Sequence, residues 1–163
     1  MLFRSDDLTG NFSDVTREGW QLALDVSAYS LVAISKRAKP LMSSGSSILA
    51  LTYLGGERYV PNYNVMAVAK SALECSVRYL AAEFGDLNIR VNALSAGPVK
   101  TLAFKGIAGS DILYKINAIR APLQRNITLE EVGNSGLYLC SPLSSGVTGE
   151  THHVDSEIGR AHV

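Results

Sequence analysis

The 163-residue sequence predicts part of one doubly wound α/β domain built on a parallel sheet. Residues 48–54 form a nearly continuous apolar run, as expected of a parallel strand that is covered on both faces. Segments with helical spacing of apolar residues precede and follow this run. The resulting order, helix–strand–helix–strand–helix–strand, implies a parallel sheet with right-handed crossovers. The sequence contains no repeat, low-complexity segment or internal linker, so a single domain is expected.

The first helix is expected to begin after Ser13, which can cap it, and to run toward Pro40. Its predicted packing face follows from spacings of four, three and four residues and consists of Leu22, Val26, Tyr29 and Ala33. The serine- and glycine-containing segment 43–46 separates this helix from the apolar strand.

A second helix follows the strand, which Gly55 and Gly56 terminate. It is expected to start near Pro61 or Asn62 and to end at Gly85, a residue type that often caps helix C-termini. One face carries small and apolar residues that permit close packing: Ala69, Ala72, Leu73, Ser76, Val77 and Leu80.

The remaining elements complete the alternation. Residues 89–94 are predicted to form the second strand, residues 95–98 a loop and residues 112–119 a helix. Thr128 and Glu131 have the spacing of a capping box, which predicts a further helix that starts after Thr128. Residues 151–154 are a candidate last strand.

Composition excludes several classes of function. Fifteen basic and fifteen acidic residues cancel, so no charge excess points to nucleic acid or to an anionic membrane. No apolar stretch approaches the roughly 18 residues of a transmembrane helix. The two cysteines form no CxxC pair, which favours a cytoplasmic protein with ordinary thiols. Adjacent strand residues point to opposite faces, so His152 and His153 are not expected to bind one metal ion.

Candidate catalytic residues gather where the predicted strands end, the edge at which such sheets bind ligands. Tyr53 ends the first strand, and Tyr63 and Lys70 follow on the next helix, seven residues or two turns apart. A lysine favours the phenolate of a neighbouring tyrosine, and a phenol can donate a proton to an oxygen that gains negative charge. The alternative is a solvated lysine over a packed ring. Glu74 and Arg78 are predicted to be an i,i+4 surface pair.

Several motifs resemble those of NADH-dependent enoyl-[acyl-carrier-protein] reductases, and they occur in the same order. The matching segments are Thr52-Tyr53-Leu54-Gly55-Gly56-Glu57-Arg58, Pro61-Asn62-Tyr63-Asn64-Val65-Met66 with Ala69-Lys70, residues 90–98, Thr101-Leu102-Ala103, residues 129–135, and Gly149-Glu150 through His153-Val154-Asp155. The resemblance covers nearly all of residues 6–156. It implies the C-terminal part of a Rossmann-like short-chain dehydrogenase/reductase domain whose N-terminal part is missing.

One position separates this sequence from typical short-chain dehydrogenases, which place tyrosine four residues before the lysine. Met66 occupies that position here, and the tyrosine stands at Tyr63. Carbonyl reductases use the closer tyrosine to protonate an alkoxide. A 3-ketoacyl thioester reductase is therefore the less favoured enzyme, and a non-catalytic binding module is the alternative from another class.

The resemblance also implies roles for individual residues. Tyr63 would stabilise the enolate formed from a trans-2-enoyl thioester on acyl carrier protein, with Tyr53 and Met66 lining the substrate pocket. Lys70 would hold the nicotinamide ribose of NADH, and NADPH is not excluded. Further cofactor contacts would come from Gly97, Pro98, Val99, Thr101 and Ala103, and a loop over the acyl chain from Ala103, Phe104 and Ile107. The family implies a homotetramer, with the helices around Tyr29 and Leu73 as candidate contacts.

The two ends of the sequence resemble translated sequencing adapters rather than protein. Residues 1–5 match GTG CTC TTC CGA TCT, and residues 157–163 match GAG ATC GGA AGA GCA CAC GTC. Natural sequence is therefore expected from about residue 6 to about residue 156. No GxGxxG motif occurs in the chain, so this piece by itself is expected to bind the cofactor poorly and to be inactive.

Overall fold

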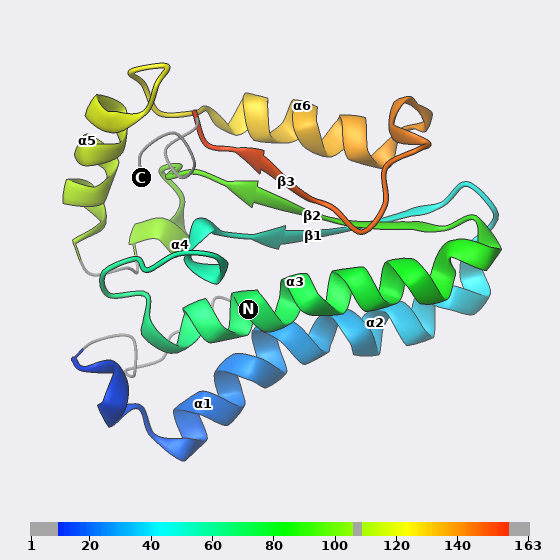
Figure 1. Cartoon of the computed structure of the whole chain (residues 1–163), viewed down its shortest axis with the longest axis horizontal. Coiled ribbons are helices and arrows are strands. Elements are labelled where there is room, and N and C mark those ends of the chain that lie inside the picture. The colour runs from blue at the N-terminus through cyan, green and yellow to red at the C-terminus, as the bar shows by residue number, and fades with distance from the viewer. Residues whose placement is uncertain (1–9, 106–108, 157–163) are drawn as a thin grey trace.

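A three-stranded sheet forms the centre of the computed structural model, which describes residues 10–105 and 109–156. The strands β1 (Ser47–Thr52), β2 (Arg90–Ala96) and β3 (Thr151–Val154) lie in that order. Both strand pairs are parallel, which confirms the predicted sheet. All three carboxyl ends therefore meet at one edge, the edge nearest α4 (Leu102–Lys105) and α5 (Ser110–Arg120) in Figure 1.

The two faces of the sheet are covered by different helices (Figure 1). α3 (Asn64–Phe84) packs on the face that carries Val91 and Ala93 and forms the main hydrophobic core with them. α6 (Leu129–Cys140) covers the opposite face, where Arg90 reaches the carbonyl oxygen of Leu139. The predicted parallel strand is thus confirmed, but its cover is incomplete, because Leu51 of β1 is 61% exposed.

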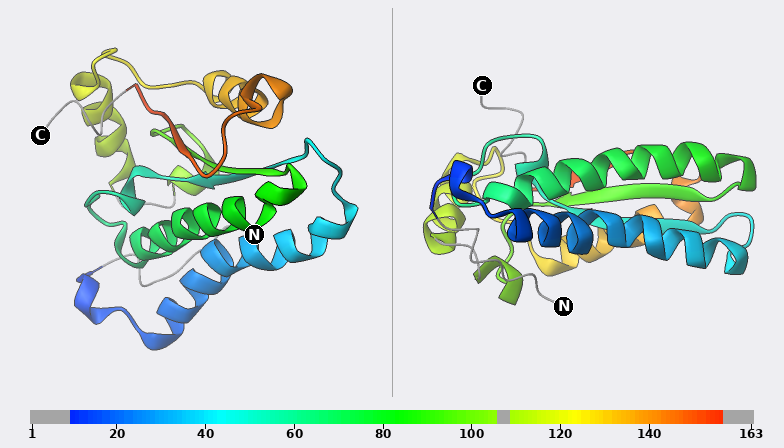
Figure 2. Two further views of the ribbon diagram at one scale, coloured as in Figure 1. Left: turned by 45° about the vertical axis from the view of Figure 1, so that its right-hand side comes forward. Right: turned by 90° about the horizontal axis from the view of Figure 1, so that it is seen from below.

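The two crossovers differ in hand. Strand order advances from β1 to β2 to β3 in one direction, while α3 and α6 lie on opposite faces (Figures 1 and 2). The short connection through α3 is right-handed as predicted, and the connection through α6 is left-handed, so the prediction of right-handed crossovers is wrong there. The handedness rule arises from a twisted strand leading directly into its helix. Here α4 and α5 lie between β2 and α6, which removes that coupling.

The N-terminal helical segment is continuous but irregular. It comprises α1 (Arg17–Leu24), a π-helical turn (Asp25–Tyr29) and α2 (Ser30–Ala38). Thr16 caps α1 by accepting a hydrogen bond from the Gly19 amide at 3.0 Å, so the predicted cap at Ser13 is wrong.

The π-helical turn also changes which residues of this segment face the core. Leu22 and Tyr29 are 48% and 61% exposed, whereas Ala23 and Ala28 are buried. The predicted face assumed an uninterrupted repeat of 3.6 residues, and a π-helical turn adds a residue to that repeat. The small residues permit close packing of α1 on α3.

Other boundaries shift by a few residues. α3 begins at Asn64, and at its C-terminal end the left-handed residue is Asn88 (φ 56°) rather than Gly85. β2 extends through Ala96, two residues into the predicted loop. α5 (Ser110–Arg120) contains the predicted residues 112–119, and α4 (Leu102–Lys105) was not predicted.

The capping box at the start of α6 is confirmed, since Thr128 accepts from the Glu131 amide and Glu131 accepts from the Thr128 amide. Within the described residues, no helix is both long and apolar enough to cross a membrane. The predicted tails, residues 1–5 and 157–163, lie outside the described part of the chain, as does Ile107.

Candidate functional site

The turn between β1 and α3 brings two predicted tyrosines together. The ring centroids of Tyr53 and Tyr63 lie 4.9 Å apart, with an edge-to-face angle of 66°. Tyr63 is only 7% exposed. Burial, followed by the proximity of Tyr53 and Glu74, raises the pKa of the Tyr63 phenol, so this group stays protonated and can donate a hydrogen bond.

Gly55 and Gly56 permit this turn because neither position has room for a side chain. A Cβ atom on Gly55 would lie 2.3 Å from Cδ1 of Tyr63. A Cβ atom on Gly56 would lie 2.7 Å from Oε1 of Glu74. The glycine pair therefore does more than end the strand, because it lets the turn approach α3 closely.

Lys70 lies on α3 and holds the end of β1. Its Nζ donates a hydrogen bond to the carbonyl oxygen of Leu51 at 2.8 Å. Burial lowers the pKa of Lys70, and the nearby Glu74 carboxylate opposes that shift. Burial raises the pKa of Tyr63, which is opposite to the direction expected from a neighbouring lysine.

The loop after β2 runs along the same edge of the sheet. The Gly97 amide donates to the carbonyl oxygen of Val154 at 2.8 Å, and a Cβ atom on Gly97 would lie 2.8 Å from Cα of Asp155. Thr101 caps α4 by accepting from the Phe104 amide at 3.1 Å. Gly97 and Pro98 are buried, so this loop is packed into the domain.

One cavity of about 740 Å³ connects these groups. Most of the predicted site residues line it: Tyr53, Tyr63, Met66, Lys70, Gly97, Val99, Thr101 and Phe104. The prediction had not included the wall that Val26, Ser27, Ser30 and Leu31 contribute, nor Leu129 and Val132 of α6. The irregular π-helical turn, which contains Val26 and Ser27, leaves no recognisable pattern in the sequence. Ala103 lies on α4, and Pro98 lies in the loop after β2.

Glu74 is the functional candidate that sequence reasoning missed. It was predicted to form a surface pair with Arg78, but it is 6% exposed and accepts a hydrogen bond from Thr52 Oγ1 at 2.5 Å. Arg78 is exposed. Gly56 in the turn after β1 and Thr52 of β1 both contact this carboxylate, and these contacts are tertiary.

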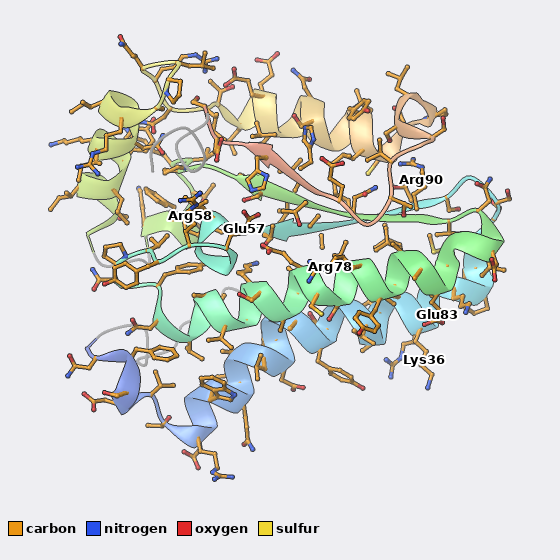
Figure 3. The ribbon with its side chains drawn as sticks, in the orientation of Figure 1. Lys36, Glu57, Arg58, Arg78, Glu83 and Arg90 are labelled. Atoms are coloured by element: carbon orange, nitrogen blue, oxygen red, sulfur yellow. The ribbon has the colours of Figure 1, made fainter. Side chains whose placement is uncertain are left out.

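The two adjacent histidines point to opposite faces, as expected from strand geometry. The His152 ring lies 6.2 Å from the ring of Tyr138 on α6. His153 Nε2 lies 2.9 Å from Oε1 of Glu57, which belongs to the turn after β1 (Figure 3). In residues 10–105 and 109–156, no cluster of three or more histidine, cysteine or acidic side chains is placed to hold a metal ion.

Comparisons with known proteins agree on one family. The family model for enoyl-(acyl carrier protein) reductase matches residues 3–156. Enoyl-[acyl-carrier-protein] reductase [NADH] 1 of Rhizobium meliloti is 56% identical over 151 residues, which are 93% of this chain and 56% of that protein. The [NADPH] enzyme of Staphylococcus aureus is also 56% identical, over 93% of this chain and 59% of its own length.

Solved structures agree with the fold. The enzyme of Candidatus Liberibacter asiaticus matches with a TM-score of 0.95 and 44% identity, over 99% of this chain and 63% of that one. The Bacillus cereus enzyme, solved with NADP+ and an indole naphthyridinone, gives a TM-score of 0.90 and 53% identity, over 95% of this chain and 60% of that one. The chain thus spans about three fifths of the length of these relatives.

Proposed function

Because this chain belongs to the enoyl-[acyl-carrier-protein] reductase family, we propose that the whole protein reduces a trans-2-enoyl thioester on acyl carrier protein to the saturated acyl thioester, with NADH, in fatty acid synthesis. The observation that carries this proposal is the meeting of Tyr53, Tyr63 and Lys70 on one cavity, with Met66 where other short-chain dehydrogenases carry tyrosine.

The residues around the cavity fit the nicotinamide end of a dinucleotide. Lys70 presents an ammonium group, which can donate to ribose hydroxyls. Gly97, Pro98, Val99, Thr101 and Ala103 belong to the adjacent stretch of chain, where backbone groups and a hydroxyl can bind the nicotinamide and phosphates. When bound, the dinucleotide supplies the hydride.

Tyr63 supplies the hydrogen-bond donor to the thioester oxygen in the proposed reaction. Reduction at C3 of the enoyl group leaves negative charge on the thioester oxygen, and a positioned phenol stabilises that charge. The raised pKa of Tyr63 favours this role, because a protonated phenol is a donor and a phenolate is not. Tyr53 packs against the Tyr63 ring and, with Met66, Ala103, Phe104 and Ile107, would contact the substrate.

Two substrates and two cofactors test the proposal. Absorbance decay of NADH should be fast with a trans-2-enoyl thioester and negligible with a 3-ketoacyl thioester, because Met66 cannot protonate an alkoxide. Faster turnover of the keto substrate would support the ketoreductase alternative, and turnover of neither would support a binding module. A parallel NADPH assay decides the coenzyme, since relatives named for each are equally similar to this chain.

Further parts of the proposal concern the protein's assembly and location. A homotetramer in the cytoplasm is proposed for the whole protein. We expect the 163-residue chain alone to bind little dinucleotide and to be inactive, because its sequence contains no glycine-rich pyrophosphate turn.

A further inference from the structure

Glu74 is a buried carboxylate that the proposed reaction does not use. It follows Lys70 by one turn on α3 and is 6% exposed. A buried carboxylate is costly when ionised unless hydrogen bonds or opposite charges compensate for the lost water. The role of Glu74 therefore follows from the hydrogen bonds and charges that surround its carboxylate.

Glu74 and its neighbours on α3 clamp the turn that carries Tyr53. Thr52 Oγ1 donates to Glu74 Oε1 at 2.5 Å. Ser71 Oγ donates to the carbonyl oxygen of Gly56 at 2.5 Å, and Lys70 Nζ donates to that of Leu51 at 2.8 Å. Three side chains within two turns of one helix thus hold both ends of the segment that contains Tyr53.

Other charges act on Glu74 from the sheet, the turn and α3. Thr52 pairs with Ser95, and Ser95 pairs with His153, so these three residues form one row across the sheet. His153 Nε2 lies 2.9 Å from Glu57 Oε1. Two further charges near Glu74 come from Glu57 on the turn after β1 and from Arg78 on α3 (Figure 3).

The pKa of Glu74 reflects these opposing influences. Burial raises the pKa of Glu74 and outweighs the hydrogen bond from Thr52, which lowers it. Glu57 raises this pKa further, whereas His153 and Arg78 lower it. Because the folded-state pKa is raised, the fold loses stability as the pH rises from the ordinary carboxyl value toward the raised one.

We propose that Glu74 is a positioning residue that fixes the turn carrying Tyr53 and, one helical turn from Lys70, serves as the countercharge of the Lys70 ammonium. The catalytic meaning of this inference rests on the proposed function, in which the Lys70 ammonium binds the nicotinamide ribose. The electrostatic part of the inference concerns only Glu74 and Lys70, so it can be tested by titration without the enzymatic reaction. The other titratable or charged groups around Glu74 and Tyr63 are Tyr53, Glu57, His153 and Arg78.

The first experiment titrates Lys70 directly. The whole protein is labelled with ¹³C at lysine Cε, and the Lys70 resonance is assigned by its absence from Lys70→Arg. In Glu74→Gln the midpoint of the Lys70 titration should fall by about one pH unit, the size of effect that an opposite charge nearby produces. Glu83→Gln removes the same charge from an exposed place on the same helix and should leave the midpoint unchanged.

Glu74→Asp keeps the charge and should keep the midpoint near the wild-type value. A wild-type midpoint in Glu74→Gln overturns the inference, as does an equal shift in Glu83→Gln. Glu74→Gln retains an oxygen that accepts from Thr52, and the sign of the Glu74 pKa shift predicts no loss of thermal stability.

The second experiment uses the whole reductase. The alkaline limb of the pH profile of kcat/KM should move to lower pH in Glu74→Gln. Thr52→Val breaks the hold on the turn but leaves the charge, so it should lower kcat without moving that limb to lower pH. Identical limbs in Glu74→Gln and wild type would contradict the inference. Failure of the whole protein to reduce enoyl thioesters would instead overturn the proposed function. The conclusion drawn from the Lys70 titration would still hold.

Discussion

Arg90 is a buried cation at the start of β2, at the opposite end of the sheet from the candidate site (Figure 3). Its Nη1 donates to the carbonyl oxygen of Leu139 at 2.8 Å and to Ser144 Oγ at 2.7 Å, and its Nη2 donates to the carbonyl oxygen of Ser141 at 3.1 Å. The cation thereby binds carbonyl groups at the C-terminus of α6, where the helix dipole is negative.

Replacing Arg90 with methionine should lower the free energy of unfolding by about 3 kcal/mol, because buried oxygen acceptors at the end of α6 would lose their donor. Urea titration followed by circular dichroism measures the change. Lys36→Met, at an exposed position on α2, is the control and should change stability by less than about 0.5 kcal/mol. Equal effects of the two substitutions would contradict the assigned role of Arg90.

Tyr63→Phe should lower kcat of the whole reductase by roughly 100- to 1000-fold, the usual effect of removing one donor to an oxyanion. The phenyl ring keeps the packing against Tyr53, so fluorescence titration should show nearly unchanged NADH affinity. Lys70→Ala should have the converse signature, with strongly weakened NADH binding. Retention of wild-type turnover by Tyr63→Phe would rule out the proposed enolate contact.

At the scale of elements, the sequence predicted helices and strands where local patterns determine them. The apolar run of β1 and the capping box of α6 are signals contained within a few residues, and both elements were predicted. Leu22 and Tyr29 were predicted to face the core, but they are exposed because the π-helical turn breaks the helical repeat. The burial of Glu74 depends on the turn that packs against it, and no local pattern encodes that contact.

The capping box gives a prediction with a defined dependence on pH. Thr128→Ala should cost about 1 kcal/mol of stability. The hydrogen bond from Arg125, with those from Thr128, lowers the pKa of Glu131 to about 2. A lowered folded-state pKa stabilises the fold above the ordinary carboxyl pKa, and this contribution is lost as the pH falls through the folded value.

Thermal unfolding of Glu131→Gln across the pH range checks this sign. The variant should be less stable than wild type at pH 7, and the difference should disappear by about pH 2. Glu130→Gln, its exposed neighbour in the same first turn, should show a smaller change. A difference that grows on acidification would refute the role of Glu131.

At the scale of the whole molecule, the apolar surface around Tyr29 is a candidate contact of the proposed tetramer. Leu22, Tyr29 and Val32 line a surface hollow together with Ser76 of α3. Leu73, on a helix proposed for subunit contacts, is 5% exposed and belongs to the core. Ala69 packs with Ala23 in a second core cluster, so part of the small-residue face of α3 serves contacts within the chain.

Tyr29→Asp in the whole protein should therefore shift its mass, measured by light scattering, from tetramer toward smaller species. Tyr29 is 61% exposed, so the substitution should leave thermal stability nearly unchanged. Leu41→Asp, at a position that is 87% exposed outside this hollow, is the control. A wild-type monomer would contradict the proposed assembly, and an unaltered tetramer in Tyr29→Asp would exclude this surface.

The π-helical turn has a consequence for how the gene can change in length. Ala23 and Ala28 are five residues apart and are both buried, a spacing that the additional residue of the turn makes possible. Deleting the codon for Asp25 would leave these alanines four apart, which still places them on one face of a regular α-helix. Deleting one codon inside α2 would instead rotate the preceding part of the helical segment by about 100° relative to the rest of the fold. Length variants of this family should therefore differ by one codon within residues 25–29 more readily than in either flanking helix.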